Sequence, residues 1–593
     1  MKQRKKIAIY QVFTRLFGNA LNTNKPWGSI EENGIGKFNG FSLKALQKIK
    51  ELGVTHIWFT GVLHHALIND YTKWGISNDF PEIVKGRAGS PYAIKDYYNV
   101  NPDLAENPAE RLNEFLDLIK RTHQIGLKLI IDIVPNHVAR NYMSISKPKG
   151  ISDFGSNDDK SIVYHRNNNF YYNPGEYFKA PEWLNGYQVL GGDSNINSNE
   201  NFVEFPAKWT GNGSRLSQPH FYDWYETVKL NYGISPENVK DFDSLPENFR
   251  CKTNAEHFHF WKNKDIPDTW KKMREIALYW QNMGVDGFRY DMAELVPVEF
   301  WSYLNSCLKM INPEFLLLAE VYNPADYRNF IYNGKMDYLY DKVELYDTLK
   351  AIIRGEENTD RIIHIQNNLS DIEHHMLHFL ENHDEQRIAS PEFAGNPFDA
   401  LPAMVLSACI STSPTMIYFG QEVGEPAAEN AGFGSSSRTS IFDYIGVPNH
   451  QRWMNNNKFD GGQLSDEELK LREYYKSLLN FTLNSTAIIG KYQEIHGHNR
   501  AYTHWYNNHV FSFCRYSDSE KLIIICNFHH TDTFGFDLEI PSYLITLWKM
   551  TDGDYLLTDQ LFGNYHTNMS IRNALGKTRI TIAALESFIL KVI

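Results

Sequence analysis

Short apolar runs alternate with amphipathic helical patterns along the first part of the chain. The runs over 7–13, 55–63 and 127–138 predict three strands, because brief apolar runs rich in β-branched residues are typical of buried strands. Between them, residues 42–53 and 107–126 place their apolar side chains with the period of a helix. Strands that alternate with helices predict a parallel sheet.

The same alternation returns further along the chain, with helical patterns over 269–284 and 299–311. Five more strand-like runs cover residues 285–292, 315–322, 336–341, 375–382 and 415–422. Eight strands separated by helices or long connections predict a closed (β/α)8 TIM barrel, which is an α/β fold.

Two segments depart from this rhythm. Residues from about 140 to 230 are rich in Asn, Gly, Ser, Pro and aromatics without a helical period, and predict an irregular domain inserted after strand 3. From about residue 490, short strands and turns predict an all-β sandwich domain. We therefore expect a catalytic barrel over 1–138 and 232–485, an inserted domain over 139–231, and a C-terminal β-sandwich domain over 486–593.

Charge and composition exclude several classes of function. The net charge of −12 comes without a long basic run, which argues against a nucleic-acid partner, and no apolar run is long enough to cross a bilayer. The N-terminal residues lack the apolar core of a secretion signal, so we expect a cytoplasmic protein. The five scattered cysteines favour buried free thiols over a disulfide framework.

Acidic residues stand at the ends of four predicted strands. Asp132 ends the third strand, Asp291 the fourth and Glu320 the fifth, while Asp384 follows the seventh. Active sites of such barrels lie at the C-terminal ends of the strands, so these acids are expected to meet at one rim. Carboxylates gathered there repel one another at a cost to stability, which favours a functional over a structural interpretation.

Paired carboxylates suggest cleavage of a glycosidic bond, in which one acid protonates the leaving oxygen and the other attacks the anomeric carbon or activates water. Arg289 stands two residues before Asp291, so both side chains point to the same face of the strand. A cation in that position is expected to keep a nucleophilic carboxylate ionised. A structural ion pair is the simpler alternative.

Four motifs at these strand ends resemble the α-amylase family, glycoside hydrolase family 13. They are DIVPNHV (132–138), GFRYDMAE (287–294), LLLAEVYNP (316–324) and FLENHDEQR (379–387), and they occur in the family's order. GSPYAIKDYYNV (89–100) is similar to the family's segment after the second strand, YFGQEVG (418–424) to its eighth strand end, and VKLNY (228–232) weakly to the close of its inserted domain.

The resemblance implies a role for each matched position. Asp291 would be the nucleophile, Glu320 the general acid and then base, and Asp384 the residue that stabilises the transition state, while Asp132 would be mainly structural. The residues implied to bind the sugar or position the nucleophile are Tyr92 beneath the ring, His137 and His383 at its hydroxyls, and Arg289 beside Asp291. Arg387 could reach a sugar further along or pair with an acid, and we favour the structural role.

One departure concerns the residues after the nucleophile. Many α-amylases carry Lys-His there, near the leaving group and a structural calcium, whereas this chain has Met292, Ala293 and Glu294. Asn136 matches a calcium-ligand position of some relatives, but no oxygen-rich Asp cluster of a calcium loop is evident. A structural calcium is therefore left open and not favoured, and the chemistry itself requires no cofactor.

The resemblance implies a retaining hydrolase of α-glucosidic bonds, most simply α-1,4 bonds in maltodextrin, starch or glycogen. An α-glucan transglycosylase would use the same residues with a sugar hydroxyl as acceptor. A non-catalytic carbohydrate-binding relative is disfavoured because all three acids are present. Phe442 and Tyr444 could equally line the cleft or not, and the sequence leaves endo or exo action and the oligomeric state open.

Overall fold

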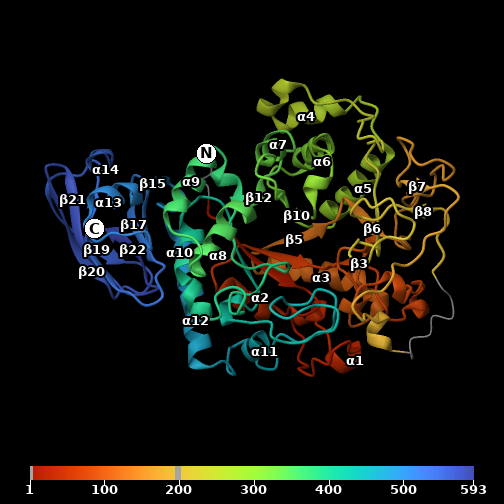
Figure 1. Ribbon diagram of the computed structural model, residues 1–593, viewed down its shortest axis with the longest axis horizontal. Coiled ribbons are helices and arrows are strands. Elements are labelled where there is room, and N and C mark those ends of the chain that lie inside the picture. The colour runs from red at the N-terminus through yellow and green to blue at the C-terminus, as the bar shows by residue number, and fades with distance from the viewer. Residues whose placement is uncertain (1–4, 194–201) are drawn as a thin grey trace.

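The computed structural model of the chain describes residues 5–193 and 202–593. Its centre is a parallel barrel in the order β13-β12-β11-β10-β5-β2-β1-β14 (Figure 1), closed by the parallel bridge between His378 and Thr415. The eight strands are β1 (Ala8–Phe13), β2 (His56–Thr60), β5 (Lys128–Ile133), β10 (Gly287–Tyr290), β11 (Leu316–Ala319), β12 (Tyr338–Tyr340), β13 (Met376–Leu377) and β14 (Thr415–Tyr418). The predicted TIM barrel is confirmed.

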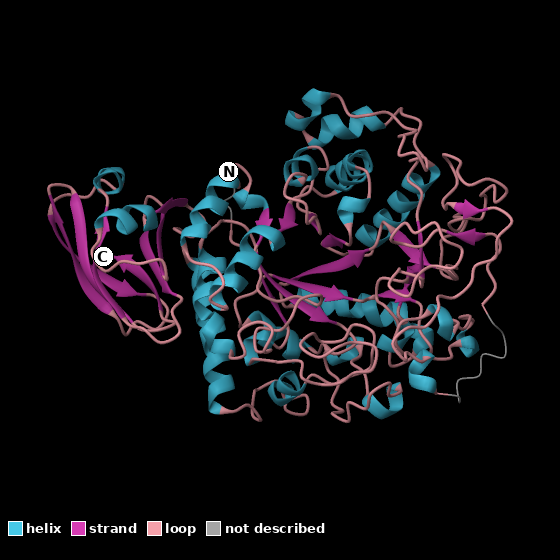
Figure 2. Ribbon diagram, viewed as in Figure 1, coloured by secondary structure: helices cyan, strands magenta, loops and turns pink. Residues whose placement is uncertain are grey.

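Helices surround the barrel and explain why its strands are apolar on both faces (Figure 2). They include α2 (Leu43–Lys50), α3 (Arg111–Gln124), α5 (Asp268–Asn282), α6 (Val298–Ile311), α8 (Asp347–Ile353), α10 (Leu401–Cys409) and α12 (Asp466–Asn484). The Asn107 side chain accepts from the Ala109 N–H and caps a 3₁₀ turn, Pro108–Glu110, that leads directly into α3.

Two predicted strands are shorter than their apolar runs. The run over 55–63 leaves the barrel after Thr60, and β3 (Leu63–His65) then pairs antiparallel with β4 (Ile94–Val100). The run over 127–138 ends at Ile133, two residues before Pro135, which has no N–H for a parallel ladder. These strands end early because their later residues turn away to build the rim.

The segment between β5 and α5 is largely irregular, as its composition predicted. Its base is the antiparallel pair of β6 (His137–Ala139) and β9 (Thr227–Lys229), and a second pair joins β7 (Tyr172–Asn173) to β8 (Ala207–Lys208). In the short helix α4 (Asn254–Trp261), His257 and Trp261 are buried and bonded to Ser302, so these aromatic side chains pack inside the protein.

The C-terminal part is an antiparallel sheet of eight strands in the order β15-β16-β17-β22-β19-β20-β21-β18. These are β15 (Lys491–Glu494), β16 (Val510–Tyr516), β17 (Lys521–Asn527), β18 (Phe534–Ile540), β19 (Gly553–Asp559), β20 (His566–Arg572), β21 (Leu575–Ile582) and β22 (Ser587–Val592). Apolar side chains from both ends of the sheet share one core, so the sheet folds over itself. The two short helices α13 (His496–Tyr502) and α14 (Ser542–Leu547) were not predicted.

The C-terminal sheet packs on the barrel through α10, which contacts β17 and β22 (Figure 1). All five cysteines are free thiols and four of them are buried, as their apolar surroundings predicted. Within residues 5–193 and 202–593, no helix combines the length and apolarity needed to cross a membrane.

Candidate active site

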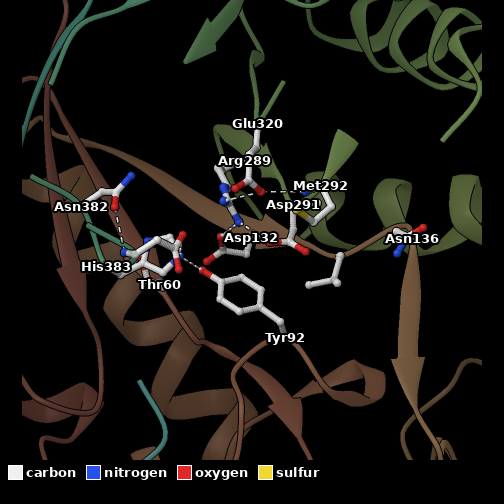
Figure 3. Close-up of polar contacts among 12 residues, drawn as sticks. Thr60, Tyr92, Asp132, Asn136, Arg289, Asp291, Met292, Glu320, Asn382 and His383 are labelled. Atoms are coloured by element: carbon white, nitrogen blue, oxygen red, sulfur yellow. Dashed lines mark hydrogen bonds and ion pairs between the residues drawn. The ribbon is translucent and has the colours of Figure 1, made fainter. Parts of the chain in front are cut away.

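Asp132, Asp291 and Glu320, predicted from three strand ends, gather at one rim of the barrel (Figure 3), and Asp384 lines the same pocket as Asp291 and Glu320. Arg289 on β10 lies beside Asp132 on β5 in the strand register, so the two side chains start as neighbours. Asp291 follows Arg289 by two residues and Glu320 directly follows β11, the adjacent strand. Parallel strands that end together thus bring side chains close that lie up to about a hundred and ninety residues apart in the sequence.

Arg289 joins the carboxylates from below. Its guanidinium is fully buried; Nη1 lies 2.9 Å from Asp291 Oδ1 and 3.4 Å from Asp132 Oδ1, and Nη2 lies 2.9 Å from Glu320 Oε2. Arg289 Nε also donates to the Tyr340 hydroxyl at 3.1 Å. One cation thus fixes two of the predicted catalytic acids relative to each other. Because it lies beneath the acids, Arg289 positions them and does not line the pocket.

The surroundings shift the pKa values of Asp291 and Asp384 in opposite directions. Burial raises the pKa of Asp291, and nearby Glu320 and Asp384 add to this rise, while Arg289 opposes it. The net direction is upward because burial outweighs the ion pair, while Arg289 acts in the expected direction and favours the ionised carboxyl. Burial also raises the pKa of Asp384, but His383 and Arg289 outweigh burial there and the net pKa is lowered.

Glu320 is held on both of its oxygens. Oε2 accepts from the Met292 backbone N–H at 2.8 Å, and Oε1 accepts from the Tyr322 hydroxyl at 2.5 Å. Met292 adopts the left-handed conformation, with φ at 44°, which is uncommon for a residue with a side chain. That backbone turns the Met292 N–H towards Glu320 and lets the next residue, Ala293, donate to the Glu320 carbonyl at 3.1 Å.

Glu294, the last residue of the unusual Met-Ala-Glu stretch, anchors the backbone that follows Glu320. Its Oε2 accepts from the backbone N–H groups of Tyr322 and Asn323 at 2.9 and 3.0 Å. It thereby anchors the segment that carries the Tyr322 hydroxyl to Glu320. Sequence reasoning noted Glu294 as a departure but missed Tyr322; the available signal was an aromatic hydroxyl two residues beyond a predicted catalytic acid.

His383 connects Tyr92 to Asp384. Its Nε2 lies 2.9 Å from Asp384 Oδ2 and contacts the Tyr92 hydroxyl, while its Nδ1 lies 2.8 Å from the Gln11 side-chain amide. The His383 side chain is fully buried, so its predicted contact with a sugar is not available in this conformation. Its Nε2 is already in contact with both the Tyr92 hydroxyl and Asp384. We therefore correct His383 to a residue that orients Asp384 and Tyr92.

The pocket above these groups has an empty volume of about 620 Å³. Its lining comprises Lys85, Ser90, Tyr92, His137, Trp224, Glu226, Thr227, Asp291, Met292, Glu320, Asp384, Ile441 and Phe442. The three predicted catalytic acids, Tyr92 and His137 are therefore together. Phe442 lines the pocket, whereas Tyr444 is buried and donates to Asp103. Sequence reasoning missed Lys85, Trp224, Glu226 and Ile441, which come from irregular loops.

His137 faces this pocket as a neutral group. Burial, followed by the charges of Lys229 and Lys85, lowers its pKa to about 3. Its ring packs against Trp224 with the ring centres 5.2 Å apart. A neutral imidazole both donates and accepts hydrogen bonds, which suits a sugar hydroxyl.

Arg387 does not reach the pocket. It is fully buried, its Nη1 lies 2.9 Å from Glu381 Oε2 and 2.9 Å from the Phe419 carbonyl, and its Nε donates to Thr439. The possible role in substrate binding is therefore corrected to the structural one that the sequence favoured, because Nε and Nη1 bond to groups behind the rim and Arg387 is not among the residues that line the pocket.

Asn136 does not fit a calcium site. Its Oδ1 accepts from the Lys229 ammonium at 2.6 Å, and its Nδ2 donates to the Gly211 carbonyl at 2.8 Å. An ammonium on the ligand oxygen excludes a second cation there. Nowhere in the described ranges do three or more His, Cys, Asp or Glu side chains gather as metal ligands would. The candidate assignment of Asn136 to a metal is therefore corrected.

Comparisons with known proteins identify the family of the chain. A family model described as the α-amylase catalytic domain matches residues 11–185 and 257–484, and one described as the α-amylase C-terminal all-β domain matches residues 504–591. Alpha-amylase 3 of Dictyoglomus thermophilum is 21% identical over 91% of this chain and 88% of its own length. The intracellular maltogenic amylase of Bacillus subtilis is 20% identical over 70% of this chain, which spans 55% of that relative.

Solved structures share the fold along nearly the whole chain. A maltogenic α-amylase from Thermotoga neapolitana matches with a TM-score of 0.59 and 17% identity, covering 99% of this chain and 98% of its own. An α-amylase from Geobacillus thermoleovorans, determined with acarbose, matches with a TM-score of 0.60 and 16% identity over 100% of this chain and 99% of its own. At these identities the match concerns the fold alone.

Proposed function

Because this chain belongs to the α-amylase family of glycoside hydrolases, we propose that it hydrolyses α-1,4-glucosidic bonds of maltodextrin-like glucans with retention of the anomeric configuration. The observation that carries the proposal is the pocket in which Asp291, Glu320 and Asp384 converge, with Arg289 joined to two of them. A retaining pair stands about 5–5.5 Å apart. The guanidinium shared by Asp291 and Glu320 supports a close pair of this kind.

In the first step, Asp291 attacks the anomeric carbon while Glu320 gives its proton to the departing glycosidic oxygen. This breaks the glycosidic bond and forms a glycosyl ester on Asp291. In the second step, Glu320 takes a proton from water, the water oxygen attacks the anomeric carbon, and Asp291 leaves as a carboxylate. Protons and electron pairs balance with water as the only co-reactant, so no cofactor is needed.

The remaining residues bind and orient. Tyr92 supports the ring, and neutral His137 is placed to bond a hydroxyl. Asp384 keeps its charge because its pKa is lowered, which suits it to stabilise the positive charge that develops at the anomeric carbon. The same charge raises the pKa of Asp291. Arg289 bonds to both Asp291 and Glu320 and so holds the two acids in one place.

The substrate class is supported by the similar proteins. Relatives include a neopullulanase of Thermoactinomyces vulgaris and the intracellular maltogenic amylase of Bacillus subtilis, and solved structures of similar proteins hold maltose or maltotriose. We extend to this chain an α-glucan substrate and a cytoplasmic location. Recovery of the protein from a culture or periplasmic fraction would contradict the location.

The reaction is tested by following maltoheptaose hydrolysis with NMR. We expect the α-anomer to be released first, and initial release of the β-anomer would contradict retention. Glu320→Gln should lower activity by about 10²–10⁴-fold, as is usual for loss of a general acid. Wild-type activity in that variant would overturn the assignment, and products longer than the substrate would show transfer to a sugar instead of water.

A further inference from the structure

Two loops that are bonded to each other line one side of the pocket. The loop over 84–90 follows β3, and residues 441–442 lie in the loop after β14. The Ala88 N–H donates to the Phe442 carbonyl at 3.1 Å. Gly86 permits this approach, because its φ is +69° and a Cβ there would lie 2.1 Å from the Phe442 carbonyl oxygen.

Arg15 fastens this junction from beneath. Its Nη1 donates to the Ala88 carbonyl at 3.0 Å and its Nη2 to the Ile441 carbonyl, so one buried guanidinium bonds to both loops. Arg15 lies two residues after β1, so the junction lies over the C-terminal end of the barrel's first strand. Backbone bonds and a buried cation make this a fixed wall rather than a passing contact between mobile loops.

The wall stands opposite the general acid. In the closed barrel order, β1 and β11 are four strands apart in a ring of eight, and Glu320 follows β11. The pocket lining includes Glu320 and Met292 as well as Lys85, Ile441 and Phe442 of the wall. The cavity therefore runs from the acid to the wall.

A salt bridge extends the wall to the inserted segment. Lys85 Nζ lies 2.9 Å from Glu226 Oε2, and the two side chains are only 13% and 7% exposed. Lys85 belongs to the wall loop and Glu226 to the inserted segment just before β9, so the ion pair links the wall to that segment. Both groups line the pocket, where charged donors and acceptors form strong hydrogen bonds with sugar hydroxyls.

The position of Glu320 indicates which end of the substrate faces the wall. Glu320 must protonate the glycosidic oxygen, so the part of the substrate that leaves, on the reducing-end side, lies towards Glu320. The wall then faces the non-reducing end. We propose that the enzyme is exo-acting: it removes a short unit of fixed length from the non-reducing chain end, whose terminal hydroxyls bind Lys85 and Glu226. This inference rests on the proposed hydrolysis of α-glucans.

A blocked chain end tests the inference directly. Two maltoheptaosides are compared, one with a free non-reducing end and one carrying a 4,6-O-ethylidene group there, with products separated by chromatography. We expect one short product from the free substrate from the earliest times, and cleavage of the blocked one at least 100-fold slower. Similar rates, or a ladder of products from the start, would overturn exo action.

Two further substrates separate this inference from the proposed function. γ-Cyclodextrin has no chain end and should not be cleaved, so its rapid opening would also overturn exo action. α-Glucosyl fluoride needs only the site around the cleaved bond. Activity on this fluoride together with cleavage of the blocked chain would refute exo action but not the proposed function. No activity on any of these substrates would refute the proposed function and the inference resting on it.

Variants test the wall itself. Phe442→Ala should raise the relative rate on the blocked maltoheptaoside about tenfold or more by opening the wall, and Lys85→Met should raise KM for the free one about tenfold. Phe562→Ala, at a 52% exposed aromatic of the C-terminal part, is the matched control. If the two wall variants melt like the parent yet show the control's ratios and KM, the wall does not select chain ends.

Discussion

Replacing Tyr322 by Phe removes the hydroxyl that bonds to Glu320, the proposed general acid, and leaves the aromatic ring in place. In the parent, this hydroxyl donates to Glu320 Oε1 at 2.5 Å, while Oε2 keeps the Met292 N–H at 2.8 Å and Arg289 at 2.9 Å. We expect Glu320 to remain in the site but to lose the restraint that aims its outer oxygen at the glycosidic bond.

The expected loss follows from the strength of this bond. A hydrogen bond to a charged group contributes about 1.5–3 kcal/mol. Each 1.36 kcal/mol is tenfold in rate, so kcat/KM on maltodextrin should fall about 10- to 150-fold. Glu294→Ala should produce a smaller loss of the same kind, because it frees the backbone of Tyr322 and Asn323 but leaves the hydroxyl present.

The assay compares two leaving groups. A sugar alkoxide needs a proton from Glu320, whereas fluoride departs with little help, so Tyr322→Phe should retain nearly full activity on α-glucosyl fluoride. Tyr502→Phe is the control, since Tyr502 is 73% exposed in the C-terminal part. Equal losses on both substrates would refute acid positioning and show that Tyr322 acts in sugar binding.

Two further predictions concern groups outside the reacting atoms. Treatment with EDTA should leave the melting temperature unchanged, and a melting temperature that EDTA lowers and calcium restores would contradict this. Lys229→Met should lower the free energy of unfolding by about 1–3 kcal/mol, because Asn136 Oδ1 loses its buried partner. Burial raises the pKa of Glu381 to about 7 although Arg387 opposes it, so the stability from protonated Glu381 is present below about pH 4.5 and is lost as pH rises through 7. In urea unfolding, the free energy of unfolding of the parent should therefore fall by about 3 kcal/mol over that range relative to Glu381→Gln. Glu314→Gln, at an exposed glutamate, is the control. A difference between the parent and Glu381→Gln that does not change with pH would refute this prediction.

The strands and the catalytic acids could be predicted because both leave a local pattern. A buried parallel strand needs apolar side chains on both faces, so each appears as an apolar run, and an acid directly after such a run stands at the rim. Asp291, Glu320 and Asp384 were found in this way. Strand ends were less predictable, since the run over 127–138 stays apolar beyond Ile133, where the chain already leaves the barrel.

Residues whose role depends on a partner far away in the sequence were predicted less well. Arg387 and His383 carry groups suited to sugars, but Arg387 is taken up by Glu381, and His383 is covered by Tyr92. Asn136 matches a ligand position, and only Lys229, ninety-three positions further along, shows that an ammonium occupies its oxygen. No local pattern predicts these pairings, because each partner comes from a different loop.

The sequence by itself determined the barrel, the order of its domains and the type of chemistry, since apolar period and the acid at each strand end are properties of single segments. Only the tertiary structure decided how the acids are held and where the pocket ends. Arg289 bridges Asp291 and Glu320, and the wall joins residues 86–88 to 441–442, because closing the barrel brings strand ends and loops within hydrogen-bond distance across hundreds of residues. Such contacts depend on the closure of the whole ring and leave no pattern in any one segment.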